Sequence, residues 1–517
     1  MPRNRVIYNS EALFAGQKVG DKCYTEDEGV NSIKQLHRVQ NANYSFNISR
    51  TDVNQFGELA AIDRIITDTP TVALDFSYYL SNFANEEALG LNVAGDVATL
   101  GGGDPFGDGE GLTTALKFFL DGSKDQRNYF IQTSSEGTDA NNDQDDRNKS
   151  VIGIGNGFLT SYSVEASVGG LPTVSIGVEG LNMAFENGML LKDAGLGTYD
   201  YQRSWATASG TIPKLYDGSK ALISLSQNPN NHTYSGVAVQ GAQDTGWTSS
   251  GVRLPSINPV DGTKSQGVFF LPTVSGHAGA DTSGILNLST LRPGDVRLYF
   301  RQVEQGGQAA LSGYGQEASE GLESFKDPDI PGVGLPTQSG YRREVADSND
   351  ADGGVQAAHI QSFSLDFGLS RTPLQRLGVK HAFSREVDFP LTVSLSVDAI
   401  LADLTTGNLA DIIDCDRSYD IAVEMCAPAD CTAGTVAHDL RDFDSRTPVA
   451  TYIVKNAKLD SESFSSSIGD NKSVTLDFTA QIGGPNQSGN GLFMKGVTPS
   501  NIGAAQFATT DAPFATV

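Results

Sequence analysis

Two stretches of this chain, 321 positions apart, follow the same pattern of residue types, so any fold for the chain has to accommodate one module twice. The sequence YSFNISRT at 44–51 aligns without a gap with LDFGLSRT at 365–372. The same register continues beyond both stretches, until Leu80 falls on Leu401. A module that is copied within one chain is typical of proteins that work by assembly of repeated units.

Three further blocks repeat in the same order, with offsets that change along the chain. Residues 112–114 match 404–406 at an offset of 292, and residues 159–182 match 459–482 at an offset of 300. Between these blocks, an offset of 290 aligns Arg127, Tyr129 and Ile131 with Arg417, Tyr419 and Ile421. The fall in offset from 321 to 292 predicts extra residues at 81–111 in the first repeat. The rise from 290 to 300 predicts extra residues in the second repeat, in the loop that holds Cys426 and Cys431. Core elements keep their length while loops vary.

The repeats predict a first domain over residues 1–190 and a second domain over residues 289–517. Residues 191–288 form either a β-rich insert or an extension of the first domain, and the sequence leaves both alternatives open. Residues 304–358 are rich in Gly, Gln, Ser and Asp and are expected to form a long loop of the second domain.

The shared blocks alternate with a period of two, which predicts half-buried β-strands. Tyr44, Phe46 and Ile48 lie on one face of such a strand, and residues 365–369 repeat this phase with Leu, Phe and Leu. Each repeat also carries a pattern typical of one short helix, at 112–120 and at 404–413. The predicted fold class is therefore mainly β, with two copies of a β-sandwich or barrel domain that each contain one short helix.

Composition limits the classes of function. The formal net charge is −26, and phosphate binding needs clustered Lys and Arg, so a nucleic-acid-binding face is not expected. The first residues lack the apolar core of a signal peptide, and no apolar run has the length of a membrane span, so we expect a soluble protein made in a cytoplasm. Its four cysteines are then expected to be reduced.

Motifs that carry chemistry are weak in this sequence. The glycine-dense stretch 101–111 lacks the Gly-Lys-Ser/Thr ending of a phosphate-binding loop and is expected to be a surface loop. Residues 139–145 alternate Asp and Asn like a calcium loop but lack its glycine and its bidentate Glu. The six histidines have no metal-ligand spacing. The sequence therefore predicts no catalytic residue, no cofactor and no metal site, and we expect a protein that is not an enzyme.

The connections between paired strands, at 51–70 and 372–390, repeat residues that a solvated loop does not need. One interpretation is that two glycines meet a backbone requirement while the arginines pair locally. The other interpretation is that each connection is an interface arm, with arginines that bind carboxylates of a neighbouring subunit. The residues of this predicted contact are Arg50, Phe56, Gly57, Arg64, Arg371, Leu377, Gly378 and Arg385.

At these residues the sequence resembles the tail tube, or major tail, proteins of long-tailed bacteriophages. The resemblance is carried by YSFNISRTDVNQFGELA at 44–60 and VALDFSYYL at 72–80, and further by RNYFI at 127–131 and GFLTSYSVEASVGG at 157–170. It covers most of residues 1–182 and, through the repeat, 355–485. The resemblance implies two packed β-sheets and one helix per domain, with six domains closing a ring whose inner sheets form a continuous barrel.

Since this chain carries the domain twice, the resemblance implies trimeric, pseudo-hexameric rings that stack into a tube for DNA. Implied partners are the chain itself and other tail proteins such as the tape measure, terminator and baseplate proteins, with DNA passing through without specific binding and no membrane insertion. The implied location is the virion tail, after synthesis in the host cytoplasm. Acidic residues available to line the lumen are Asp75, Glu179, Asp366, Asp398 and Asp477.

Two alternatives compete with a tail tube. One is another ring-forming tail component on the same fold, such as a baseplate, neck or tube-tip protein. The other is a carbohydrate-active β-protein, which the scattered aromatic and acidic residues would serve.

Overall fold

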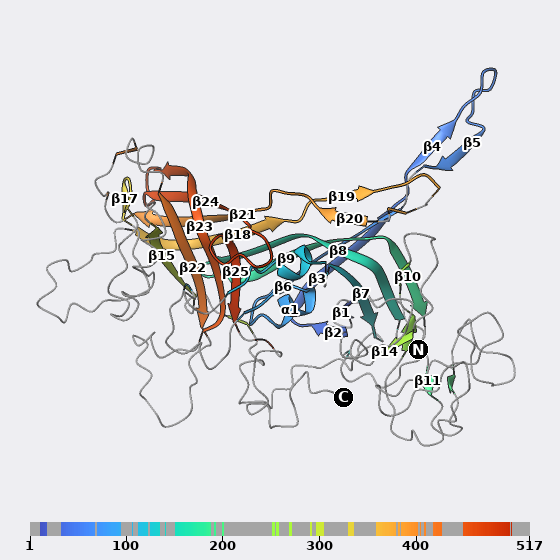
Figure 1. Ribbon diagram of the computed structural model, residues 1–517, viewed down its shortest axis with the longest axis horizontal. Helices are drawn as coiled ribbons and strands as arrows, with labels where there is room; N and C mark the ends of the chain where they lie inside the picture. Colours follow the sequence, from blue (N-terminus) through green and yellow to red (C-terminus); the bar gives the residue numbers. More distant parts are fainter. Residues whose placement is uncertain are drawn as a thin grey trace, which may run out of the picture.

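The computed structural model describes most of the strand-forming parts of the chain. The described residues are 11–17, 33–67, 70–94, 112–122, 125–134, 150–187, 296–303, 329–334, 358–378, 384–401, 417–426 and 448–496, with short pieces at 106, 140, 191–192, 199–200, 251–253, 255–257, 268–270, 290–291, 381–382, 404, 408–409 and 498. Strands dominate these residues, which confirms the prediction of a mainly β protein (Figure 1).

One continuous antiparallel sheet, here called the long sheet, runs through both repeats. The first repeat contributes β3 (Val39–Asn47), β6 (Thr71–Tyr79), β9 (Thr173–Gly180) and the C-terminal part of β8 (Ser150–Ser167). The second repeat contributes β18 (Ala358–Gly368), β21 (Thr392–Leu401), β24 (Ser473–Gln481) and the C-terminal part of β23 (Pro448–Ser465). The strand order is β3-β6-β9-β8-β18-β21-β24-β23, so the repeats join where β8 pairs with β18.

The N-terminal parts of β8 and β23 leave the long sheet and pair with a second set of strands. In the first repeat these are β2 (Ile33–Leu36), β1 (Glu11–Gln17), β7 (Gln126–Thr133) and β10 (Asn182–Asn187). In the second repeat they are β15 (Val296–Val303), β22 (Ser418–Cys426) and β25 (Gly491–Gly496). Where the strands change partners, Asn156 and Asn456 have positive φ angles of 52° and 57°, which asparagine tolerates better than most residues.

The two repeats have the same register and the same irregularities. The pairing of β3 with β6 has a shift between Val39 and Asn41, and the pairing of β18 with β21 has one between Ile360 and Ser362. The β8–β9 ladder shifts at residues 159–161, and the β23–β24 ladder shifts at 459–461. Since bulges fix which residues face the core, these matches give a residue-by-residue correspondence between the repeats, with offsets of 321 and 300.

The structure corrects one part of the sequence alignment. Arg127 pairs with Gly157, and the residue that pairs with the equivalent Ala457 is Tyr419, so this strand corresponds at an offset of 292 and not 290. The buried backbone confirms the new offset, because the N–H of Asn156 donates to Asn128 Oδ1 while the N–H of Asn456 donates to Asp420 Oδ1. The alignment was wrong because it matched similar side chains two residues away, which keeps the same face of the strand.

The hydrophobic core lies between the long sheet and the second set of strands. Buried and more exposed residues alternate along the strands of the long sheet, as predicted. Leu365 and Phe367 are buried, and Val174, Ile176 and Val178 are buried on the neighbouring part of the sheet. The turns at the ends of β8 and β23 contain Gly169 and Gly469 at positive φ, which glycine adopts without steric cost.

The helices differ from the prediction. The described residues contain α1 (Ala84–Leu89), where no helix was expected, and α2 (Lys117–Leu120), which occupies only the end of the predicted stretch 112–120. Both belong to the first repeat. In the second repeat, Leu409 lies in a helical conformation within the predicted stretch 404–413, and the side chains of Leu404 and Leu409 are exposed. Residues 412–413 lie outside the described part, so the extent of this helix stays a prediction.

The extra residues of the first repeat connect it to the second. Ala94 forms a parallel bridge with Lys495 of β25, and the N–H of Ala115 donates to the carbonyl oxygen of Leu492. Phe106, from the stretch expected to be a surface loop, is buried against the second repeat beneath the guanidinium of Arg301, which lies 4.3 Å from its ring centroid. At least this residue of the glycine-dense stretch belongs to a core.

Part of the region left open by the sequence contacts the first repeat. The backbone N–H and carbonyl of Ile257 both hydrogen-bond with the side chain of Asn156, at 2.8 and 3.0 Å. The remaining described pairs are short: β11 (Leu191–Lys192) with β12 (Tyr199–Asp200), β13 (Gly251–Arg253) with β14 (Val268–Phe270), and β16 (Asp329–Ile330) with β17 (Val333–Gly334). The domain boundaries at 190 and 288 stay predictions.

Candidate assembly surfaces

The predicted interface residues lie on two equivalent β-hairpins. In the first repeat, β4 (Arg50–Val53) pairs with β5 (Asp63–Ile66), and in the second, β19 (Arg371–Leu374) pairs with β20 (Ser384–Val387). Their tips contain Gly57 and Gly378 at φ angles of 94° and 87° with nothing within 4 Å of an added Cβ. Backbone conformation and not space therefore requires glycine at both positions.

The second hairpin is fixed on the first repeat by two buried arginines. Arg371 forms an ion pair with Asp125 at 2.5 Å, and Arg385 forms one with Glu179. Both guanidinium groups also lie over the ring of Phe158, at 5.0 and 5.8 Å from its centroid. Burial raises the pKa of the Asp125 carboxyl, although Arg371 opposes the rise. These arginines therefore bind carboxylates of their own chain, across the junction between the repeats.

The first hairpin makes no such contact with the described residues and projects from the body of the molecule (Figure 1). Arg64, the equivalent of Arg385, pairs with Asp52 on the same hairpin at 2.6 Å, and its side chain is 67% exposed. Phe56 and Leu59 at the tip are fully exposed. An exposed ion pair contributes little stability, so Arg64 can exchange Asp52 for another carboxylate. Phe56 and Leu59 present apolar surface at the tip.

The acidic residues predicted to line a lumen share the polar face of the long sheet. Asp75, Asp366 and Asp398 are exposed, and Asp477 is partly buried. Asp398 accepts hydrogen bonds from Ser362 and Thr475. Burial raises the pKa of Asp366. Glu179 lies on the same face but forms an ion pair with Arg385, so its charge is neutralised there.

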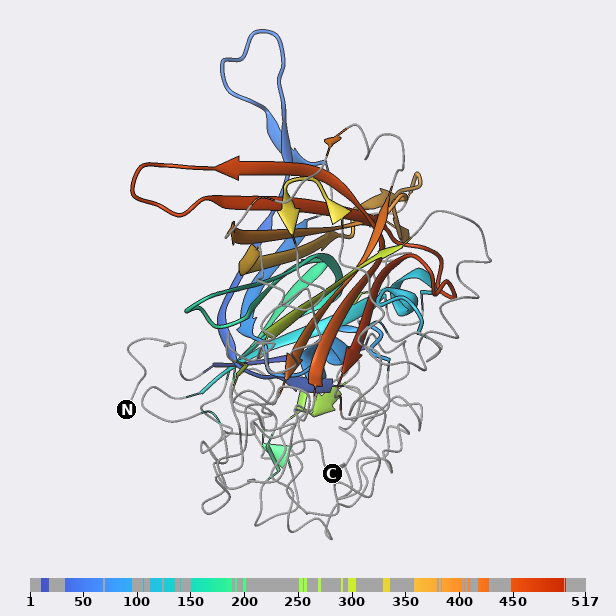
Figure 2. The ribbon, with the colours of Figure 1, turned by 90° about the vertical axis from the view of Figure 1, so that its left-hand side faces the viewer.

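The long sheet ends in two open edges. Among the described strands, β3 pairs only with β6, and the C-terminal part of β23 pairs only with β24. The β23–β24 turn extends away from the body, and Ile468 at its tip is fully exposed (Figure 2). Edge strands of this kind can pair with another chain. The sequence indicated these strands, but it did not show which edges stay unpaired.

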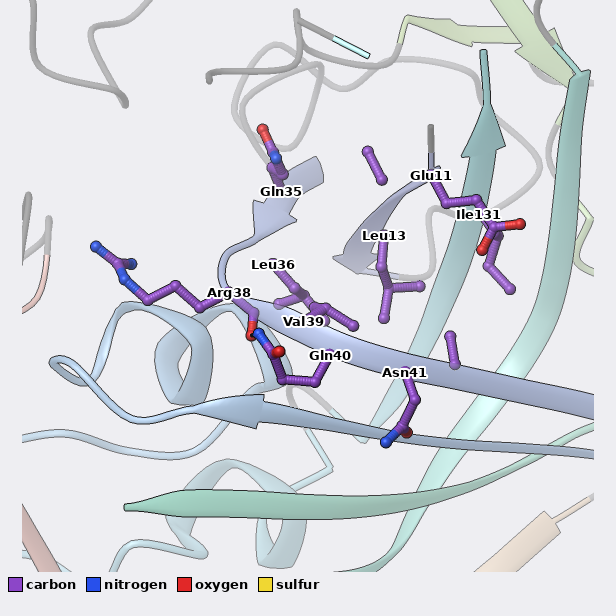
Figure 3. Close-up of a pocket in the computed structure, with 11 residues that line it drawn as sticks. Glu11, Leu13, Gln35, Leu36, Arg38, Val39, Gln40, Asn41 and Ile131 are labelled. Carbon is purple, nitrogen blue, oxygen red and sulfur yellow. Dashed lines mark hydrogen bonds between the residues drawn. The ribbon is translucent and has the colours of Figure 1, made fainter. Parts of the chain in front are cut away.

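A pocket of about 160 Å³ lies beside the open edge of β3 (Figure 3). Its apolar lining includes Leu13, Leu36 and Ile131, and it reaches the edge at Asn41 and Ala42. The equivalent of Ala42 in the second repeat is Phe363, which is buried.

A carboxyl group is buried in the core at this junction. Tyr78 and Tyr162 donate hydrogen bonds to Glu86 Oε1 at 2.6 and 3.2 Å, and the hydroxyls of Tyr162 and Tyr452 lie 2.5 Å apart. Burial raises the pKa of Glu86 from 4.5 to about 7, although the hydrogen bonds from the tyrosines oppose the rise. Because Tyr452 belongs to the second repeat, this cluster links the two cores.

Stability is expected to depend on pH through Glu86. The unfolded chain loses the Glu86 proton near pH 4.5 and the folded chain near pH 7, so this contribution is complete below pH 4.5 and is lost as the pH rises through 7. The loss is roughly 3 kcal/mol. Urea unfolding of Glu86→Gln between these pH values should show a flatter dependence than the parent chain. The exposed variant Glu165→Gln serves as control, and equal slopes for Glu86→Gln and the parent would contradict the assignment.

No group of three or more metal-binding side chains occurs among the described residues, and residues 139 and 141–145 of the calcium-like stretch lie outside that part. Cys426 is a buried thiol whose Sγ lies 3.5 Å from Oε1 of Glu424, and Cys431 lies outside the described residues. None of the described helices is long and apolar enough to cross a membrane.

No protein-family model and no curated protein matches this chain. Among solved structures, the chain is similar to the SPP1 tail tube determined by solid-state NMR and cryo EM. The match covers 41% of this chain and 100% of that chain, with 12% sequence identity and a TM-score of 0.22.

Proposed function

We propose that this protein is a structural subunit of a bacteriophage tail tube, without a catalytic role. Three chains close a pseudo-hexameric ring through the edges of their long sheets, and rings stack into a tube through which DNA passes. The observation that carries the proposal is the junction between the repeats, where β8 of the first repeat pairs with β18 of the second. The equivalent strands are β23 of the second repeat and β3 of the first, and among the described strands each of them has an unpaired edge in the long sheet. Such a chain has complementary ends, and head-to-tail contacts close into rings when the rotation permits.

The polar face of the long sheet supports the conduction of DNA. In a closed ring this face, opposite the hydrophobic core, lines the channel with Asp75, Asp366, Asp398 and Asp477. A wall of like charge repels phosphate and keeps DNA from adhering. The projecting β4–β5 hairpin provides a surface for contacts beyond one ring, and the other tail proteins are the remaining partners in this proposal.

Electron microscopy of the purified chain tests this function. The expected result is rings with sixfold appearance that contain three chains by light scattering, and tubes at higher concentration. A chain that stays monomeric at concentrations typical of tail assembly, or rings with a basic lumen in a reconstruction, would overturn the proposal. Abundance in purified virions separates a tube subunit from a baseplate or neck component, because such a component is present in few copies.

A further inference from the structure

The junction inside the chain shows how two long sheets pair. Residues Ser161–Ser167 of β8 pair antiparallel with Ser362–Gly368 of β18, with Ser163 opposite Asp366. Outside this ladder, the N–H of Val168 donates to the carbonyl of Gln361 at 2.9 Å, and the N–H of Leu369 donates to that of Thr160 at 2.8 Å. The alternation of antiparallel ladders then makes Ser163 and Asp366 a non-hydrogen-bonded pair, the kind with the closer Cα atoms.

The open edges have the same backbone as the edges of this junction. β3 corresponds to β18 at an offset of 321, and β23 corresponds to β8 at an offset of 300, with bulges at matching positions. Three large apolar side chains at the open edges are exposed, whereas the side chains at the equivalent positions of the internal junction are buried. Tyr44 and Phe46 are 39% and 58% exposed, and their equivalents Leu365 and Phe367 are 0% and 2% exposed. Phe464 is 45% exposed, and its equivalent Val164 is buried.

We propose that β23 of one chain pairs with β3 of a neighbouring chain in the register of the internal junction. Residues 461–467 then lie antiparallel to residues 47–41, with Phe464 opposite Tyr44 and Ser463 opposite Ser45. The N–H of Ile468 donates to the carbonyl of Gln40 in the neighbouring chain, at the mouth of the pocket beside β3. This inference rests on the proposed function and adds to it the residues and register of ring closure.

One charge contact at the hairpin is compatible with the same register. The hairpin β4–β5 has the register of β19–β20, and Arg64 stands where Arg385 stands. In the second repeat, Thr479 replaces Glu179, the carboxylate that binds Arg385, but Thr479 donates a hydrogen bond at 2.6 Å to Asp460, the equivalent of Thr160. In the second repeat, a carboxylate is therefore present on β23, at Asp460, and not on β24, and Asp460 is exposed. The predicted register brings Arg64 of the neighbouring chain to Asp460.

Several positions depart from the internal junction, and Lys458 stands where Phe158 lies beneath Arg371 and Arg385. Glu462 stands where β8 has Tyr162, whose ring stacks on Phe367 at a centroid distance of 5.2 Å. At the junction between chains this residue lies opposite Phe46, so the stacking of two rings is absent there. The contact between chains is therefore expected to be weaker than the junction within the chain, which suits subunits that fold before they assemble.

Disulfide trapping tests the register. Ser45→Cys with Ser463→Cys in one chain is expected to give covalent dimers and trimers on non-reducing gels after mild oxidation of assembled particles, because this pair corresponds to the close pair Asp366 and Ser163. Ser45→Cys with Ser467→Cys is the matched control on the same face, displaced by roughly 13 Å. The parent chain controls for its native cysteines, and Asp366→Cys with Ser163→Cys should close within one chain.

The outcomes separate the register from the function. Covalent trimers from the first pair and not from the displaced pair support the register. Rings or tubes in micrographs that link through the displaced pair, or through neither pair, overturn the register and leave the tube function standing. A parent chain that forms no rings overturns both. Reduced assembly of Arg64→Glu that Asp460→Arg restores at least severalfold would support the charge contact, and no restoration would contradict it.

Discussion

Replacing Arg385 by Glu is expected to destabilise the folded chain by about 3 kcal/mol, near the lower end for removing one partner of a buried ion pair. The Arg385 side chain is 7% exposed, lies over Phe158 and binds Glu179. A carboxylate at this position loses that pair and repels Glu179. The loss stays at the lower end because the Glu179 side chain is 40% exposed and can be solvated. Urea unfolding of the monomeric chain measures the effect.

The matched control is Arg64→Glu, at the equivalent position of the exposed hairpin. Its side chain is 67% exposed and pairs with Asp52 of the same hairpin, so the free energy of unfolding should change by no more than about 0.5 kcal/mol. Assembly, in contrast, should be reduced by Arg64→Glu. The exchange Arg385→Glu with Glu179→Arg is expected to recover part of the lost stability. Equal destabilisation by the two single variants would contradict the different roles of the hairpins.

Proline at Tyr44 is expected to abolish ring formation while leaving the fold of the single chain intact. By correspondence with Leu365, the N–H of Tyr44 points to the open edge of β3, so the proline removes a hydrogen bond to the neighbouring chain and none to β6. Proline is tolerated on edge strands for this reason. Light scattering should show monomers at concentrations where the parent chain forms trimers.

Leu365→Pro is the counterpart of this variant inside the chain. The same change there breaks the ladder between β8 and β18 and removes a fully buried side chain, so the chain is expected to fold poorly. Tyr44→Phe keeps the backbone N–H and the apolar surface and should assemble like the parent chain. If Tyr44→Pro still formed rings, ring closure would not involve this edge.

Much of the strand architecture could be predicted from the repeat and the alternation. The alternation identified the buried faces, as at Leu365 and Phe367. The alignment of β7 with β22 failed by two residues because a shift of two keeps the face and hence the pattern. The helix α1 and the burial of Phe106 could not be predicted, since both depend on contacts with distant parts of the chain.

The candidate contact residues were found by their recurrence, but the sequence treats Arg64 and Arg385 alike. The tertiary structure distinguishes them, because the β19–β20 hairpin packs against the first repeat through Arg385 and Glu179. In the β4–β5 hairpin, Arg64 pairs with Asp52 of the same hairpin.

The sequence by itself determined that one β module occurs twice, which strands it contains and which residues recur on its connections, because period and repetition are local properties of the chain. The tertiary structure alone decided how the modules join, since strand pairing brings together residues as distant as Ser163 and Asp366. It also decided which edges stay open. An edge is open or paired only with respect to a neighbour in space, and the sequence pattern of β3 is the same as that of β18, although among the described strands β18 has two neighbours and β3 has one.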